Sequence, residues 1–266
     1  MKTRKKNGRR DARRRSFELL WGGRQRFGPG PRPALSLEQT SRAAVDIVDT
    51  EGLPALTMGR VAERLGVTTM ALYRYVPGKE ELVDLMIDMA LGAPPAPEGL
   101  GWRTDLAQWA RANLAVLHRH PWLLEFVTSR VAIGPNWLAW VESAIRTLSG
   151  ARLSANELMA VVILVDGHVR SSAQISLGVT GTGEWAHDFS RALDTVAGDP
   201  RYAALSAWVR AGGFGARHND SEDVFEFGLE RVLDGVDALV RARAARGRRR
   251  TVRRTGPSRP RKRSQH

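Results

Sequence analysis

The sequence predicts an all-α protein in which a small N-terminal unit of short helices precedes a larger helical bundle. Apolar residues recur every three or four positions over most of the chain, and no stretch alternates as a strand would. Two capping boxes, Ser36 with Gln39 and Ser154 with Glu157, mark helix starts. A break with three prolines, residues 93–99, separates the two parts. These signals are typical of a two-part helical architecture.

Both ends of the chain are strongly basic, whereas the part between them is acidic. Residues 1–15 carry nine Lys or Arg and residues 241–266 carry twelve, with 20 basic and 27 acidic residues in between. We therefore expect residues 1–35 to form a basic, largely disordered arm with one short apolar segment, Phe17–Trp21. Residues 246–266 are expected to form a basic disordered tail. Such ends either attract nucleic-acid phosphates or only keep the chain soluble.

The first compact unit is expected at residues 36–91. It opens with an amphipathic helix that begins after Ser36 and ends before Gly52, because glycine is favoured just beyond a helix. Its last helix begins near Lys79 and has two acidic residues in the first turn, next to the positive end of the helix dipole. Four short helices within this range make a small, locally connected domain.

Between these helices, residues 57–79 are interpreted as two short helices joined by a tight turn. Gly66 ends the first helix, since a left-handed residue after a helix is easily adopted only by glycine. Thr68 then caps a second helix of about two turns that reaches Tyr75. A helix–turn–helix of this size is the unit that places its second helix in the DNA major groove. The first helix has one apolar stripe, formed by Met58, Val61, Ala62 and Leu65.

Beyond a linker at residues 92–101, residues 102–245 are expected to form an all-helical domain. The helix launched by Ser154 is apolar nearly all round between Leu158 and Val165, which predicts that it is buried. The expected helices are residues 102–118, 135–148, 154–177, 184–196, 200–209 and 221–245.

Composition and motifs argue against several other classes of protein. There is no cysteine, so neither disulfides nor thiolate chemistry are expected. No hydrolase, zinc-protease or phosphate-loop motif occurs, which predicts a protein that is not an enzyme and needs no cofactor. His118 and His120 have the wrong spacing for a helical metal pair, so no metal is expected. The longest purely apolar run, Met159–Val165, is far shorter than the roughly 20 residues of a membrane helix, which favours a cytoplasmic protein without a membrane partner.

The segment from Leu37 to Leu91 resembles the DNA-binding domain of the tetracycline-repressor (TetR) family of bacterial transcriptional regulators. The resemblance is carried by Glu51-Gly52-Leu53, by LTMGRVAERLGV at residues 56–67, and above all by ALYRYVPGKEEL at residues 71–82. It implies a one-component regulator, with repression as the common outcome, that binds a palindromic operator in double-stranded DNA. It further implies a homodimer formed through the 154–177 and 221–245 helices, and release by a small-molecule ligand of unknown identity in the C-terminal domain.

The resemblance also implies which residues contact DNA. Thr57 and the start of the second motif helix would meet phosphates and base edges, and Lys79 would clamp a phosphate. Met70 could equally be a core residue, and Tyr75 could close the small core. The segment 36–91 has five basic and nine acidic residues, so positive charge must be presented locally. The predicted DNA-binding residues are Thr57, Arg60, Thr68, Thr69, Met70, Tyr73, Tyr75 and Lys79.

A ligand pocket is expected between the helices of the C-terminal domain, where aromatic residues are abundant. Each aromatic or histidine candidate has a plain alternative as a packed core residue. The predicted ligand-binding residues are Trp109, Asn113, His120, Trp140, His168 and Gln174.

The competing interpretation is a non-specific, nucleoid-type nucleic-acid-binding protein driven by its basic ends. It predicts that deletion of both ends abolishes DNA binding while Tyr73→Ala has no effect. The regulator interpretation predicts the reverse: the substitution removes one specific footprint, and the deletion only weakens the salt dependence.

Overall fold

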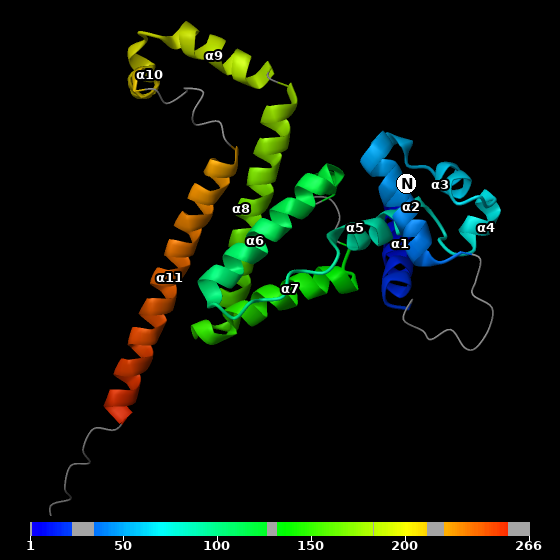
Figure 1. Cartoon of the computed structure of the whole chain (residues 1–266), viewed down its shortest axis with the longest axis horizontal. Coiled ribbons are helices and arrows are strands. Elements are labelled where there is room, and N and C mark those ends of the chain that lie inside the picture. Colours follow the sequence, from blue (N-terminus) through cyan, green and yellow to red (C-terminus); the bar gives the residue numbers. More distant parts are fainter. Residues whose placement is uncertain (1, 23–34, 127–131, 183, 212–220, 255–266) are drawn as a thin grey trace, which may run out of the picture.

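The structure is a computed structural model that describes residues 2–22, 35–126, 132–182, 184–211 and 221–254. Within these ranges the chain is helical, with no strand, as the sequence predicts. The helices form a small N-terminal head on one side and a bundle of longer helices on the other, with α5 between them (Figure 1).

The head consists of four helices around one apolar core. They are α2 (Leu37–Glu51), α3 (Met58–Arg64), α4 (Thr69–Tyr73) and α5 (Lys79–Leu91). A short 3-10 turn, Leu53–Ala55, follows α2. The predicted capping box is present, because Ser36 Oγ accepts from the Gln39 backbone N–H at 3.0 Å while Gln39 Oε1 accepts from the Ser36 N–H at 2.9 Å. The core side chains that are fully buried here include Ile47, Leu56, Val61, Leu72, Val76, Leu82 and Met86.

The expectation of a disordered N-terminal arm was wrong for much of its length. Residues Lys2–Gly22 form helix α1, and its second half packs along α5. Ala12 and Ser16 are buried there, and Arg15 Nε lies 2.7 Å from the carboxylate of buried Glu81. The sequence did not reveal this packing face, because it consists of small residues, Ala12 and Ser16, within a run of basic ones. Residues 23–34 lie outside the described part of the chain.

The bundle is built on α6 (Trp102–Arg119), α7 (Pro135–Leu148), α8 (Ala155–Thr182) and α11 (Ser221–Arg254). The 3-10 turn η2 (Pro121–Glu125) follows α6, and η3 (Ser149–Ala151) follows α7. Two predicted ends differ: α8 extends past residue 177, and α11 runs nine residues into the predicted tail. Gly247 lies two residues beyond Ala245 but does not end α11, which continues to Arg254. Residues 255–266 lie outside the described part.

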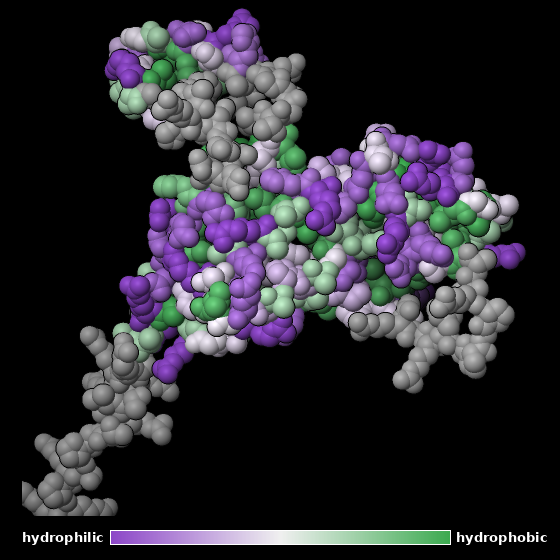
Figure 2. Space-filling model, viewed as in Figure 1, coloured by the Kyte–Doolittle hydropathy of each residue, from purple (hydrophilic) through white to green (hydrophobic). Residues whose placement is uncertain are grey.

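Helices α9 (Glu184–Val196) and α10 (Ala203–Arg210) extend from the far end of α8, away from the rest of the bundle (Figure 1). The 3-10 turn η4 (Pro200–Tyr202) connects them. No residue of α10 is buried, and apolar side chains lie on the surface at this end (Figure 2). This part of the chain therefore receives little support from its own subunit.

Helix α8 is less enclosed than its composition predicts. Its segment Ala155–Gly178 is apolar and long enough to cross a membrane by length and composition alone, and it is the one such helix in the described part. A core helix of a soluble protein passes the same test, and α8 packs against α6, α7 and α11. Only 28% of the segment is buried within the chain, so much of its apolar surface is uncovered in a single subunit.

The linker predicted at residues 92–101 lies against α7. Trp140 Nε1 donates to the backbone oxygens of Leu91 and Gly92 at 3.1 and 3.0 Å, and Ser143 Oγ donates to Pro95 O at 3.4 Å. These bonds attach the segment that leaves the head to the bundle.

Candidate functional site

The turn between α3 and α4 has the geometry that the sequence predicts. Gly66 is left-handed, with φ of +66°, and the Val67 N–H returns to the Ala62 carbonyl at 3.0 Å. Thr68 then caps α4, because its Oγ1 accepts from the Ala71 N–H at 3.1 Å. Glycine and threonine thus fix the angle at which α4 leaves the head.

Helix α4 presents a mixed polar and apolar surface to solvent at the outer end of the head (Figure 2). Met70 is 75% exposed and Tyr73 is 43% exposed, whereas Leu72 on the opposite face is fully buried. The exposure of Met70 excludes the alternative that it is a core residue. Tyr75 is half-buried and packs against the head core, so part of its ring closes that core. Met70 and Tyr73 thus give this five-residue helix an uncovered surface that is available for contact.

The two predicted cationic contacts already have intramolecular partners. Lys79 Nζ donates to the Leu56 carbonyl at 2.6 Å. Arg60 pairs with Glu51 at 2.8 Å and with Glu63 at 3.0 Å, and these hydrogen bonds raise the pKa of its guanidinium. Neither cation is a free phosphate clamp in this state. The sequence alone does not show the contacts with Glu51 of the preceding helix and with the Leu56 carbonyl, whereas Glu63 is three residues along the same helix as Arg60.

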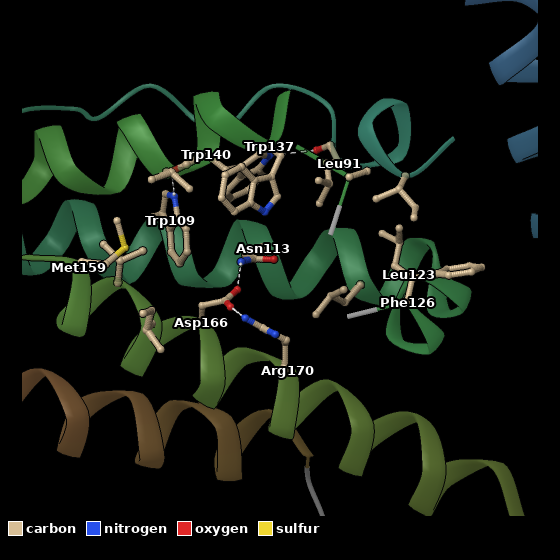
Figure 3. A pocket seen from close by; sticks show the side chains of 16 residues that line it. Leu91, Trp109, Asn113, Leu123, Phe126, Trp137, Trp140, Met159, Asp166 and Arg170 are labelled. Carbon is tan, nitrogen blue, oxygen red and sulfur yellow. Dashed lines mark hydrogen bonds and ion pairs between the residues drawn. The ribbon is translucent and has the colours of Figure 1, made fainter. Parts of the chain in front are cut away.

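A second feature is a cavity of about 250 Å³ enclosed by α5, α6, η2, α7 and α8. Its wall is mainly apolar and aromatic, and the side chains converge on one space (Figure 3). Trp109 and Trp140 meet edge to face at 5.5 Å, and Trp109 Nε1 donates to the Trp140 carbonyl at 3.1 Å. The other aromatic lining residues are Phe126 and Trp137.

Three polar side chains stand together in this apolar wall (Figure 3). Asn113 Nδ2 donates to Asp166 Oδ1 at 3.2 Å, and Arg170 pairs with the other oxygen of the same carboxylate. Burial lowers the pKa of Arg170. The pair is neutral overall, and it offers both donors and acceptors to whatever enters the cavity.

Half of the predicted ligand-binding residues line this cavity. Trp109, Asn113 and Trp140 do. Sequence reasoning also placed His120, His168 and Gln174 in the pocket, but none of them lines this cavity.

Each misplaced residue has a different setting. His120 Nδ1 lies 2.9 Å from Asp49 of the head, His168 stacks on Phe225 of α11, and Gln174 is exposed on α8. Asp166 and Arg170 were missed as cavity residues; the available signal was an i, i+4 opposite-charge pair interrupting an apolar helix.

Comparison with known proteins finds a family match for each of the two domains. Residues 42–86 match the family described as "Bacterial regulatory proteins, tetR family", and residues 93–240 match "Tetracyclin repressor-like, C-terminal domain". The HTH-type transcriptional repressor DrrR1 of Streptomyces coeruleorubidus is 40% identical over 240 residues, which is 86% of this chain and 87% of DrrR1.

Two solved structures of ActR have a fold similar to that of this chain. Apo ActR from Streptomyces coelicolor superposes with a TM-score of 0.67 at 26% identity, over 78% of this chain and 97% of ActR. ActR in complex with actinorhodin gives a TM-score of 0.65 at 27% identity, over 77% of this chain and 96% of that one.

The chain therefore belongs to the TetR family of bacterial transcriptional regulators. The family is one of helix–turn–helix transcriptional regulators, not of enzymes.

Proposed function

We propose that the chain acts as a homodimer that represses transcription from a palindromic operator and leaves it when a small molecule fills the cavity. One short recognition helix buries too little surface to specify a site alone, and two related by a two-fold axis can read half-sites about one DNA turn apart. The protein would bind its operator in the cytoplasm.

The DNA contacts are assigned to the surface of α4 and the N-terminus of α3. Thr68, Thr69 and Met70 face the base edges, and Tyr73 reaches the groove edge. Thr57 and Tyr75 contact phosphates. Arg60 and Lys79 join them only by exchanging their present partners for phosphates. The support for this assignment is the exposure of Met70 and Tyr73 beside the buried Leu72.

The dimer interface is assigned to α8 and α11. Both helices carry apolar side chains that their own subunit leaves uncovered, and a second copy related by two-fold symmetry would cover them. Phe227 is 67% exposed and Leu164 is 53% exposed. The other large apolar residues exposed on these helices outside the cavity are Ile175 and Val224, whereas Met159 and Ile163 line the cavity.

The ligand is proposed to be a planar aromatic molecule with a polar edge. The observation that carries this proposal is the cluster of Asn113, Asp166 and Arg170 in a cavity otherwise lined by indole and aliphatic groups. A flat ring system would pack against the indole rings of the wall, and a hydroxyl or carbonyl would bond to the cluster. A structural neighbour, the TetR family protein ActR, is solved in complex with a small molecule, actinorhodin.

The test is DNase I footprinting of the full-length protein on the DNA upstream of its own gene, followed by titration with actinorhodin. We expect one symmetric footprint that the ligand removes. Thr69→Ala and Tyr73→Ala should each weaken it by about 10-fold, equivalent to about 1.4 kcal/mol. Tyr202→Ala, which alters an exposed tyrosine at the far end of the chain, is the matched control.

A second set of variants separates this function from non-specific binding. Deleting residues 1–10 and 255–266 removes basic residues while keeping the described contacts of α1 and α11. If that deletion abolishes all binding and Tyr73→Ala changes nothing, the protein is a non-specific DNA binder and the repressor assignment fails.

A further inference from the structure

Helix α5 belongs to the head and to the cavity wall at once. Leu82 and Met86 are fully buried in the apolar core. Ile87 and Leu91, in the last turns of the same helix, line the cavity. A displacement of the cavity wall at this end of α5 therefore moves a helix that also holds the head together.

Asp88 lies between those two lining residues and is only 4% exposed. Its carboxylate accepts from the backbone N–H groups of Asn136 at 3.1 Å and Trp137 at 3.0 Å, which are unpaired donors in the first turn of α7. The bonding is reciprocal, because Asn136 Nδ2 donates to the Asp88 backbone carbonyl at 2.8 Å. A side chain of α5 thus caps α7 across a distance of almost fifty residues in sequence.

The contact between Asp88 of α5 and the first turn of α7 is called the joint below. It has no free space. A Cβ on Gly134, the residue before α7, would lie 2.2 Å from Asp88 Oδ1, closer than any real contact. The backbone of Gly134 is extended, with φ of −100°, so its conformation does not require glycine. Glycine is required because the carboxylate passes through the space that a side chain would occupy.

A second set of hydrogen bonds connects α5 and α7. Trp140, one turn further along α7, donates from Nε1 to the carbonyls of Leu91 and Gly92, which end α5. Trp137 and Trp140 both line the cavity. The first two turns of α7 therefore carry cavity-wall indoles and are bonded to α5 at both ends of its last turn.

We propose that Asp88 is the positioning residue that couples the cavity to the DNA-reading head. A ligand that moves the Trp137 indole must move the amide to which Asp88 is bonded, and α5 moves with it. A simple cap of α7 would need neither reciprocal bonding nor a position between two cavity-lining residues on the helix that enters the head. This inference rests on the proposed repressor function, since it names the route by which the two sites communicate.

The test uses reciprocity: if the cavity affects DNA binding, DNA binding must affect the cavity wall equally. Hydrogen exchange of the full-length protein is measured with and without the DNA fragment that it footprints. In the wild type, operator binding should change exchange protection of the amides at residues 136–141 by at least about fivefold, the low end of ordinary coupling. In Asp88→Ala, which has no acceptor for either N–H bond, the change should stay within about twofold, with operator affinity retained.

Two further variants make the result decisive. Asp105→Ala removes another buried carboxylate that accepts a backbone N–H, from Glu98 at 3.2 Å, away from the joint; it should behave as the wild type. Gly134→Ala places a methyl group against the Asp88 carboxylate and should reproduce the loss seen in Asp88→Ala.

The outcomes separate the two claims. A wild type that binds its operator with no change at residues 136–141, or an Asp88→Ala variant that keeps the full change, overturns the role of Asp88. A wild type that gives no footprint overturns the proposed function itself, and the joint falls with it.

Discussion

Replacing Gly228 by alanine tests how closely α11 packs on α8. In a helix interior, glycine to alanine normally stabilises by about 1 kcal/mol. Here the added Cβ would lie 2.3 Å from Cε1 and 2.9 Å from Nε2 of His168. The imidazole has little room to retreat, because it stacks on Phe225 at 5.3 Å and its Nε2 lies 2.9 Å from the Phe225 carbonyl. We therefore expect destabilisation where helix propensity alone predicts a gain.

The magnitude follows from three opposing contributions. Forcing an extra carbon into a packed interface costs about 1–3 kcal/mol. Losing the hydrogen bond to Phe225 costs about 1 kcal/mol. The helix propensity of alanine returns about 1 kcal/mol. The net expectation is a loss of about 1–3 kcal/mol in the free energy of unfolding.

Urea unfolding at a fixed protomer concentration measures this loss as a lower midpoint. With a slope of about 3 kcal/mol per molar, 2 kcal/mol corresponds to about 0.7 M urea. The control is the same substitution in His168→Ala, where the Cβ of Gly228→Ala meets no ring and should be neutral or stabilise by up to about 1 kcal/mol. If Gly228→Ala stabilises the otherwise native chain, or changes both backgrounds equally, the packing argument is wrong.

Three other predictions concern the recognition helix, the bundle and the cavity. Thr68→Ala removes the cap of α4 and should cost about 1 kcal/mol of unfolding free energy in urea titration, with Thr68→Ser restoring it. A hydrogen bond from Arg243 lowers the pKa of Glu157 to about 2 from 4.5; this stabilisation is complete above pH 4.5 and is lost as pH falls towards 2, so the difference in thermal midpoint between the wild type and Arg243→Gln should shrink over that window. Asp166→Asn leaves Arg170 uncompensated, so an anionic naphthalenesulfonate dye should bind at least about fivefold tighter in fluorescence titration, for about 1 kcal/mol of added attraction; unchanged affinity would contradict the assigned geometry.

The sequence predicted the helices well because their ends carry local chemistry. Ser36, Gly66, Thr68 and Ser154 each mark a boundary through a bond to a residue only a few positions away, and such bonds do not depend on the rest of the fold. The resemblance to TetR regulators rests on that local pattern, and the comparisons confirm it.

The sequence failed where a residue's role depends on a distant partner. His168 sits on an apolar helix as a ligand-binding residue would, but helix rotation turns it towards α11. Lys79 was predicted to bind a phosphate, but its ammonium donates to the backbone carbonyl of Leu56. Asp88 drew no attention at all, because a single acidic residue in an apolar helix has no local signal. Its role follows only from the bonds across to α7.

Helix α1 changes where the DNA-binding domain can be cut from the chain. A fragment that begins at Ser36, the boundary predicted from the sequence, would remove α1 from α5 and with it Arg15, the ion-pair partner of Glu81. The face of α5 against which Ala12 and Ser16 pack would then be exposed to solvent, which so small a domain tolerates poorly. An autonomous head for structural or DNA-binding work should therefore begin near residue 11, and a fragment that starts at residue 36 would report the behaviour of a damaged domain.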